Sequence, residues 1–198
     1  MKKVIYIVLF ICLAIFQLVV ISVMVYKGVK DGQRLSYKCS LYDPYDPIKG
    51  RYLRLSFSSS TLNLYLFSEY IYDQSSDFDK YKNNEVYVVY NTGKDTQNPY
   101  LITTNKPNND NIFIKAKINY INEENKTIVL EYPFDRYYIQ EDFAIEAENL
   151  LRDSANNIDY NPTLVVNIDD EGNSRITNLL IKNTPIEEYI SKKIKTKK

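Results

Sequence analysis

The chain begins with a continuous apolar stretch. After Met1-Lys2-Lys3, the segment Val4–Tyr26 contains no charged residue, and its clearly polar members are Gln17 and Ser22. An α-helix rises about 1.5 Å per residue, so roughly 20 apolar residues cross the hydrocarbon core of a bilayer. The pattern therefore predicts a transmembrane helix that contacts the lipid bilayer through Val4–Tyr26.

A cleaved signal peptide is the alternative interpretation of this stretch. Its apolar core would be about 7–15 residues long and would end at a small-x-small site. Val4–Tyr26 is longer, and it ends in Val23-Met24-Val25-Tyr26-Lys27 without such a site. We therefore predict an uncleaved signal-anchor. The basic residues on both sides of the stretch leave the orientation open by the positive-inside rule. The short basic tail before the stretch favours export of the domain that follows.

Alternation of apolar and polar residues predicts β-strands in the rest of the chain. In one of them, Ile112, Ile114, Ala116, Ile118 and Tyr120 share a face. Leu62–Tyr72 is apolar but fits a strand and a helix equally well. The predicted strands are Leu35–Leu41, Tyr52–Phe57, Glu85–Asn91, Ile112–Tyr120, Thr127–Tyr132, Leu164–Ile168 and Arg175–Ile181.

Two helices are predicted after the strands begin. Glu141–Arg152 starts with acidic residues, which suit the positive end of a helix, and carries an apolar stripe. Thr184-Pro185-Ile186-Glu187 has the form of a capping box, which predicts a short helix over Pro185–Ile190. The lysine-rich residues Lys192–Lys198 are expected to be a solvated, frayed tail.

These elements predict an N-terminal transmembrane helix followed by a β-rich soluble domain. The domain is expected to be mainly antiparallel and of the α+β class, with one amphipathic helix and a short C-terminal helix. The predicted organisation is a cytoplasmic stub and signal-anchor at 1–26, a linker at 27–34, a β-rich ectodomain at 35–190 and a basic tail at 191–198.

Composition narrows the possible chemistry. Lys+Arg and Asp+Glu balance at 25 each, so no overall basic field would attract nucleic acid. The chain has no His, which excludes a Ser-His-Asp triad, a Cys-His pair and a His-ligated zinc site. Two cysteines are too few for a Cys-ligated zinc site, and we expect no cofactor. Cys39 lies on the apolar face of a predicted strand, which indicates a buried thiol, and an intermolecular disulfide remains open.

Two segments carry a resemblance to a known family. The segment Leu41–Phe57 has a Pro-x-Asp-Pro corner and then a glycine, a tyrosine and a leucine at Gly50, Tyr52 and Leu55. It resembles the GDYXXLXY family of bacterial membrane-anchored proteins, with Phe57 in place of the last tyrosine. Arg51 replaces the acidic residue that gives the family its second letter, which is a reversal of charge.

The second segment lies before the predicted amphipathic helix. Asp135-Arg136-Tyr137-Tyr138-Ile139-Gln140-Glu141 is similar to the family's Arg-Tyr-Phe-x-x-Glu stretch. The resemblance implies an N-terminal anchor and a compact domain outside the membrane. With the export favoured above, the expected location is the inner membrane, with the soluble domain extracytoplasmic. It implies no activity. Family members are often encoded beside a multi-span membrane protein, which implies such a protein as a partner.

The motif residues have a structural and a functional interpretation. Gly and Pro in a motif usually report backbone geometry, and Arg136 can pair with a neighbouring acid. The functional interpretation is a polar recognition patch, which would make the protein an extracytoplasmic binding or assembly module. The patch consists of Asp46, Arg54, Arg136, Tyr138 and Glu141.

Enzymatic and metal-binding alternatives remain open. A membrane-anchored hydrolase could use paired carboxylates or a Ser–Lys pair, for which Ser58-Ser59-Ser60 offers hydroxyl groups at a strand end. The oxygen-rich segment Asp169–Asn173 could suit Ca²⁺, but its spacing does not match an EF-hand loop. A solvated hairpin turn explains that segment better.

Overall fold

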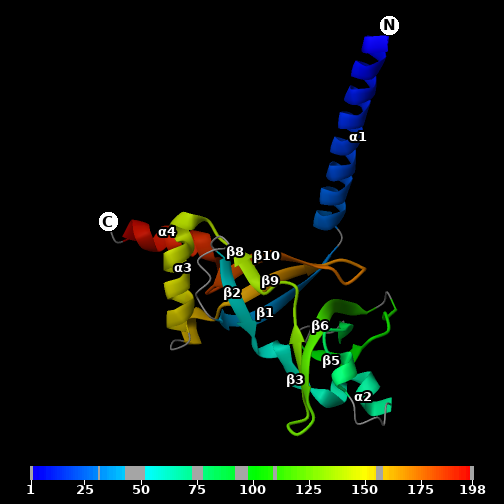
Figure 1. Ribbon diagram of the computed structural model, residues 1–198. Helices are drawn as coiled ribbons and strands as arrows, with labels where there is room; N and C mark the ends of the chain where they lie inside the picture. The colour runs from blue at the N-terminus through cyan, green and yellow to red at the C-terminus, as the bar shows by residue number, and fades with distance from the viewer. Residues whose placement is uncertain are drawn as a thin grey trace. The chain divides into compact units, whose positions relative to one another are not determined.

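The computed structural model of the chain describes residues 2–30, 32–42, 52–72, 78–91, 98–108, 111–154 and 158–196. It divides into two compact units, Met1–Gly32 and Gln33–Lys198. The first unit contains the helix α1 (Lys2–Lys30), and the second contains all the strands (Figure 1).

The helix α1 is long and apolar enough to cross a membrane over Val4–Val23. None of this stretch is buried within the structure, and its large side chains, such as Phe10 and Phe16, are exposed. A helix on the surface of a soluble domain usually has one polar face, whereas this one is apolar all round. The structure therefore contains the candidate transmembrane helix that the sequence predicts.

Two antiparallel sheets form the second unit. The first has the strand order β11-β10-β9-β1-β2-β8, and the second has the order β3-β7-β6-β4-β5. The first sheet contains β1 (Gln33–Leu41), β2 (Tyr52–Phe57), β8 (Arg136–Tyr138), β9 (Thr163–Ile168), β10 (Ser174–Ile181) and β11 (Thr184–Pro185). The second contains β3 (Thr61–Asn63), β4 (Glu85–Tyr90), β5 (Pro99–Thr103), β6 (Ile112–Asn122) and β7 (Thr127–Glu131). The predicted β-rich fold class is confirmed.

Two helices pack beside the first sheet. Figure 1 shows α3 (Glu141–Ser154) next to α4 (Ile186–Thr196), and Lys193 Nζ lies 2.9 Å from Glu146 Oε1 between them. The predicted apolar stripe of α3 is buried at Ala144, Ala147, Leu150 and Leu151. Burying such a stripe against a sheet is the main source of stability for a helix of this length.

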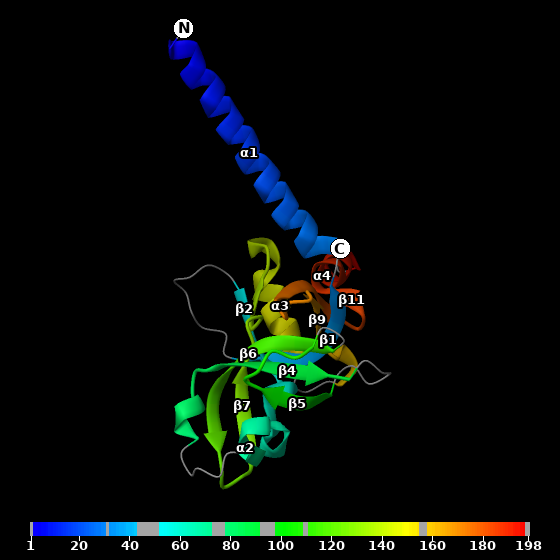
Figure 2. The same cartoon turned by 90° about the vertical axis from the view of Figure 1, so that its right-hand side faces the viewer.

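A short helix lies beside β5, the edge strand of the other sheet. Figure 2 shows α2 (Ser68–Tyr72) beside β5. The Glu69 carboxylate accepts hydrogen bonds from the Thr104 N–H (2.8 Å), the Thr104 hydroxyl and the Ser68 hydroxyl. Burial alone would raise the pKa of Glu69, but these hydrogen bonds outweigh it and lower the pKa. The carboxylate thus fixes a helix of five residues that would not be stable alone.

A buried aromatic cluster joins the two sheets. The rings of Tyr37, Phe57, Tyr90, Tyr132 and Phe134 pack with centroid separations between 5.1 and 6.3 Å. Tyr37 and Phe57 come from β1 and β2, whereas Tyr90 ends β4 in the other sheet. The side chains make the two sheets share one core.

The three phenols of this cluster form a directed chain of hydrogen bonds. Tyr132 Oη donates to the Ser59 carbonyl (3.2 Å), and Tyr37 Oη donates to Tyr90 Oη (2.8 Å). Because each hydroxyl has one proton, Tyr90 must donate to Tyr132 across the 3.4 Å contact. Burial raises the pKa of all three phenols well above the usual value, so they stay protonated and keep this direction.

Strand β6 departs from the predicted alternation. The sequence places Tyr120 on the same face as Ile118, but Ile118 is buried and Tyr120 is 49% exposed. The register shifts between these two residues, because a β-bulge at Asn119 reverses which side chains face the core. Ile121 then packs against the core in place of Tyr120. The prediction for Tyr120 was wrong.

Two other parts of the soluble domain, Leu62–Tyr72 and the C-terminal segment, also differ in detail from the prediction. Leu62–Tyr72 contains the end of β3, a 3₁₀ turn at Leu64–Leu66 and then α2, so neither single interpretation was complete. Thr184–Pro185 pairs with β10 as β11, and α4 starts one residue later than predicted. The tail that was expected to be frayed is helical as far as Thr196. Within this helix, Lys192 Nζ lies 2.6 Å from Glu188 Oε1, one turn earlier.

Candidate functional site

The outward face of β2 and β8 brings together three of the predicted site residues. In the antiparallel register, Arg54 lies opposite Arg136 and Tyr52 lies opposite Tyr138. Leu53 and Tyr137 alternate with them and are buried, because successive side chains of a strand point to opposite faces. We call Tyr42, Tyr52, Arg54, Asp135, Arg136 and Tyr138 the β2–β8 patch.

Asp135 lies between the two arginines. Its Oδ2 is 3.4 Å from Arg54 Nε, and its Oδ1 is 3.8 Å from Arg136 Nε. Each guanidinium also stacks on a tyrosine ring, Arg54 on Tyr42 at 5.0 Å and Arg136 on Tyr52 at 5.3 Å from the centroid. Stacked guanidinium groups are held in place with little loss of exposure, and both arginine side chains are about half exposed.

Of the five predicted site residues, Tyr138 completes the patch, whereas Glu141 and Asp46 are not part of it. Tyr138 is 69% exposed at the end of β8, with its ring 5.9 Å from that of Tyr52. Glu141 begins α3 and is exposed. Asp46 lies outside the described residues. The sequence did not identify Tyr42 and Tyr52 as partners of the arginines, although Tyr52 is part of the family motif.

Tyr137 faces the interior of the domain, whereas Arg136 and Tyr138 on either side of it face outward. Its side chain is buried, and its hydroxyl donates to Glu187 Oε1 of α4 at 2.7 Å. Burial and the adjacent carboxylate raise the pKa of Tyr137. This contact ties β8, a strand of three residues at the edge of the sheet, to the C-terminal helix, so that the outward patch is held on a supported strand.

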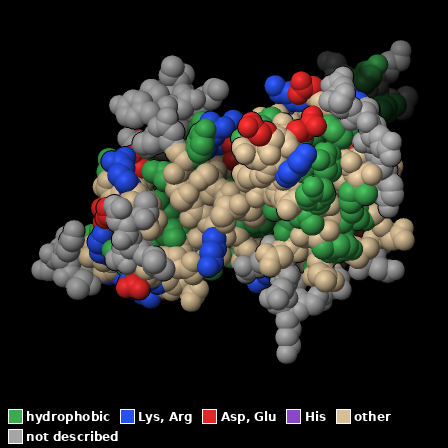
Figure 3. Space-filling model, turned by 90° about the horizontal axis from the view of Figure 1, so that it is seen from below, with side chains coloured by type: hydrophobic (Ala, Val, Ile, Leu, Met, Phe, Trp, Pro, Cys, Tyr) green, Lys and Arg blue, Asp and Glu red, His purple; other side chains and the backbone are tan. Residues whose placement is uncertain are grey.

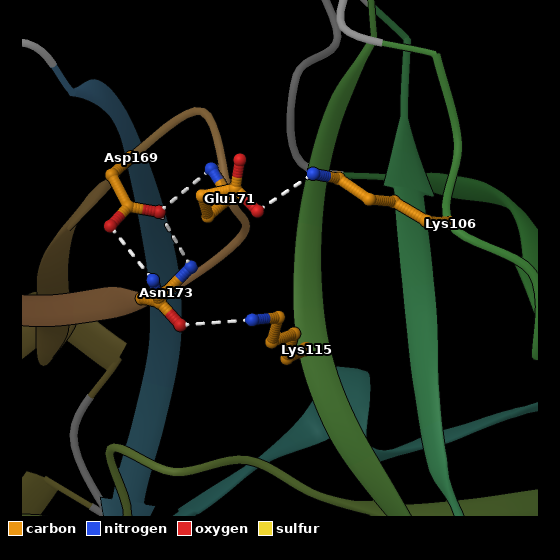
Figure 4. A network of polar contacts seen from close by, with 5 residues as sticks. All are labelled: Lys106, Lys115, Asp169, Glu171 and Asn173. Carbon is orange, nitrogen blue, oxygen red and sulfur yellow. Dashed lines mark hydrogen bonds and ion pairs between the residues drawn. The ribbon is translucent and has the colours of Figure 1, made fainter.

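The acidic turn between β9 and β10 is stabilised by its own side chains (Figure 4). The Asp169 carboxylate accepts from the N–H groups of Glu171 (3.0 Å) and Asn173 (2.8 Å) and from the Asn173 side chain (2.9 Å). Lys106 and Lys115 reach the same turn, at Glu171 (2.7 Å) and Asn173 (3.1 Å). Asp169 therefore acts as a turn residue. In the described part of the chain, no group of three or more His, Cys, Asp or Glu could hold a metal ion.

A shallow cavity of about 370 Å³ lies beside this turn. Its walls come from β4, β6, the end of β7 and the turn itself. Acidic and basic side chains alternate across the strands in the order Glu85, Lys117, Glu131. The alternation resembles a set of cross-strand charge pairs, which stabilises a sheet surface without a ligand. The lining consists of Glu85, Lys115, Ala116, Lys117, Glu131, Tyr132, Pro133, Asp135, Gly172, Asn173 and Ser174.

The serine cluster shows no catalytic geometry among the described residues. Ser58–Ser60 forms a 3₁₀ turn after β2, and the buried Ser59 hydroxyl has no hydrogen-bond partner. A Ser–Lys mechanism needs a lysine within hydrogen-bond reach of the nucleophile.

On the face shown in Figure 3, the described acidic and basic side chains are interspersed, and neither sign gathers into a single area.

Cys39 is expected to resist thiol reagents until the domain unfolds. It is buried in β1, and burial raises the pKa of its thiol to about 12, so the reactive thiolate is scarce at neutral pH. The unfolded thiol ionises near pH 9, and the free energy of unfolding should therefore fall as the pH rises from 9 towards 12. Mass spectrometry after maleimide labelling in buffer and in urea checks this. Labelling of the folded domain at the rate seen in urea would contradict it.

Comparison with protein families decides which group of proteins this chain is related to. The model of the family described as GDYXXLXY protein matches residues 17–179. The chain belongs to the GDYXXLXY family. The match extends from α1 to β10, so it covers the second half of the first unit and most of the second. No curated protein and no solved structure matches the chain.

The family motif of this GDYXXLXY protein has a mostly structural role in the described residues. Leu55 and Phe57, at two of the named positions, are buried in β2, opposite Leu41 and Cys39 of β1. Tyr52 is half-buried on the outward face and carries Arg136. Gly50 and Arg51 lie outside the described residues. The motif thus builds the strand on which the β2–β8 patch is presented.

Proposed function

We propose that this GDYXXLXY protein is a single-pass, signal-anchored binding or assembly module. Its soluble domain works on the extracytoplasmic side of the inner membrane, together with a multi-span membrane protein. The transmembrane character of α1 and the basic residues before it support the anchor. The frequent occurrence of family members beside a gene for a multi-span protein supports the partner. Turnover of a substrate is not part of the proposal.

The observation that carries the proposal is the composition of the β2–β8 patch. Three tyrosines and two arginines gather at this outward face, and among the described residues no hydrogen bond joins their side chains to the domain core. Tyr and Arg are enriched in protein interfaces, where a few such residues supply most of the binding energy. An exposed face with these side chains, held on strands that a packed core supports, is suited to contact with another protein.

Crosslinked pull-down of the full-length protein from native membranes tests the proposal. The variant Arg54→Ala with Arg136→Ala is expected to reduce recovery of the partner at least tenfold, because truncating interface hot spots costs about 2 kcal/mol or more. Arg175→Ala is the matched control, since Arg175 is an exposed arginine on β10 of the same sheet. Equal recovery with both variants would contradict the proposal.

The side of the membrane needs a separate measurement. In intact spheroplasts, an exported domain is cleaved by added protease, whereas a cytoplasmic domain is protected until lysis. We expect cleavage in intact spheroplasts and a mature chain that keeps α1 by mass. Protection before lysis would contradict export, and a mature chain that begins after α1 would contradict the anchor.

A further inference from the structure

The two arginines of the β2–β8 patch form a like-charged pair. Arg54 and Arg136 lie directly opposite each other on adjacent strands, an arrangement that costs stability when the charges are equal. Asp135 is the one acidic group that contacts them in the described part of the chain, and it approaches both at 3.4 and 3.8 Å. Two guanidinium groups and one carboxylate leave a net charge of about +1 on this surface.

The same pair has unused hydrogen-bonding capacity. A guanidinium group has five N–H donors. The recorded contact of each arginine with Asp135 is through Nε, and no hydrogen bond from a terminal nitrogen of either is found among the described residues. The rings of Tyr42 and Tyr52 hold the two groups by stacking, which does not consume donors. The two guanidinium groups are therefore held in a fixed orientation, while their terminal N–H groups remain able to donate hydrogen bonds to a ligand.

We propose that Arg54 and Arg136 together bind one carboxylate group of an acidic segment of a protein partner. The planar fork of arginine matches a carboxylate and can bind it through two parallel hydrogen bonds. A monoanion balances the residual charge of the patch, whereas a doubly charged phosphate would leave the patch with a net negative charge and would be repelled more strongly by Asp135. The exposed ring of Tyr138 beside the pair gives the flat aromatic contact that is typical of protein interfaces.

The inference depends on the proposed function, because it names the chemistry by which the β2–β8 patch recognises its partner. It also makes a distinct statement about stability. Arg136→Gln removes one charge of the like-charged pair and leaves Asp135 paired with Arg54. A role in binding alone therefore predicts loss of capture with an unchanged or slightly raised urea midpoint. A purely structural role predicts a lowered midpoint.

Photo-crosslinking from the patch tests the inference on the full-length protein in native membranes. The probe is p-benzoylphenylalanine at position 138, which keeps an aromatic ring there. The same probe at position 65 is the control, because Tyr65 is similarly exposed but lies in the turn that precedes α2. We expect a crosslink from position 138 to a peptide with Asp or Glu near the attachment point. Arg54→Gln or Arg136→Gln should weaken it at least tenfold, and 0.5 M NaCl should also weaken it.

The possible outcomes separate the two proposals. A crosslink to a protein segment without acidic residues, or one that survives both glutamine variants, overturns the carboxylate inference and leaves the binding module intact. A crosslink to lipid overturns the choice of a protein partner. No crosslink specific to position 138 overturns the proposed function as well. Lowered urea midpoints for both glutamine variants would show that the arginines stabilise the fold, and would overturn the inference that they bind a partner.

Discussion

Deletion of residues 1–31 is expected to move the protein from the membrane fraction to the soluble fraction. Each Leu, Ile, Phe or Val near the centre of a transmembrane helix contributes roughly 0.3–0.6 kcal/mol to insertion, and Val4–Val23 consists largely of these residues. Their sum is several kcal/mol, or a factor of about a thousand or more in partitioning. Fractionation after an alkaline carbonate wash measures the distribution.

The control for this deletion is the fold of the remaining domain. Residues 33–198 form a compact unit with their own core, so the truncated protein should keep its β-type circular dichroism and its protected Cys39. Leu13→Arg is a second variant, because a charge near the middle of the span costs about 2.5–3.5 kcal/mol. A full-length protein that washes off with carbonate would contradict the anchor.

The substitution Gly172→Ala is expected to lower the free energy of unfolding by about 2–4 kcal/mol. Gly172 has φ of +78°, where an L-residue with a side chain is strained. A Cβ atom there would lie 2.7 Å from two ring carbons of Phe113, which is buried in β6. The Gly172 carbonyl also accepts from the Lys115 N–H at 3.1 Å, so the turn cannot move away from the strand without losing this hydrogen bond.

Two further variants separate backbone strain from the clash. Gly172→Asn tolerates a positive φ but still has a Cβ atom, so it should remain destabilised if the contact with Phe113 dominates. Phe113→Leu should recover part of the loss when combined with Gly172→Ala, which a double-mutant cycle in urea measures. A change below about 0.5 kcal/mol for Gly172→Ala would contradict the expected clash.

Local sequence patterns correctly predicted those elements in which the buried face keeps the same periodicity from one end to the other. Leu35, Tyr37 and Cys39 alternate in the sequence and are buried in β1, and the stripe of α3 faces the first sheet as expected. The prediction failed where a tertiary contact changes the local geometry. The bulge at Asn119 inserts a residue that no periodicity reveals, and Thr184 pairs with β10 instead of acting simply as a helix cap.

The candidate site was predicted in part. Arg54 and Arg136 are far apart in the sequence, and only their presence in two family-like segments suggested that they meet. The register that places them opposite each other depends on β2 pairing with β8, which is a tertiary property. Tyr42 was missed because a ring that stacks on a cation has no sequence signature. Tyr137 belongs to the second family-like segment, but the alternation of β8 turns it inward to Glu187.

The pairing of β1 with β9 determines when the domain can fold during biosynthesis. β1 directly follows α1 in the sequence, yet Gln33 pairs with Ile168, more than a hundred residues later. Contacts between residues so far apart in the sequence slow folding. A long loop must close, at a cost in chain entropy, before the strands form any stabilising contact. One edge of β1 can pair early with β2, but its other edge therefore has no partner strand until β9 has been synthesised. The first sheet can therefore close only after the last hairpin, β9–β10, has left the ribosome.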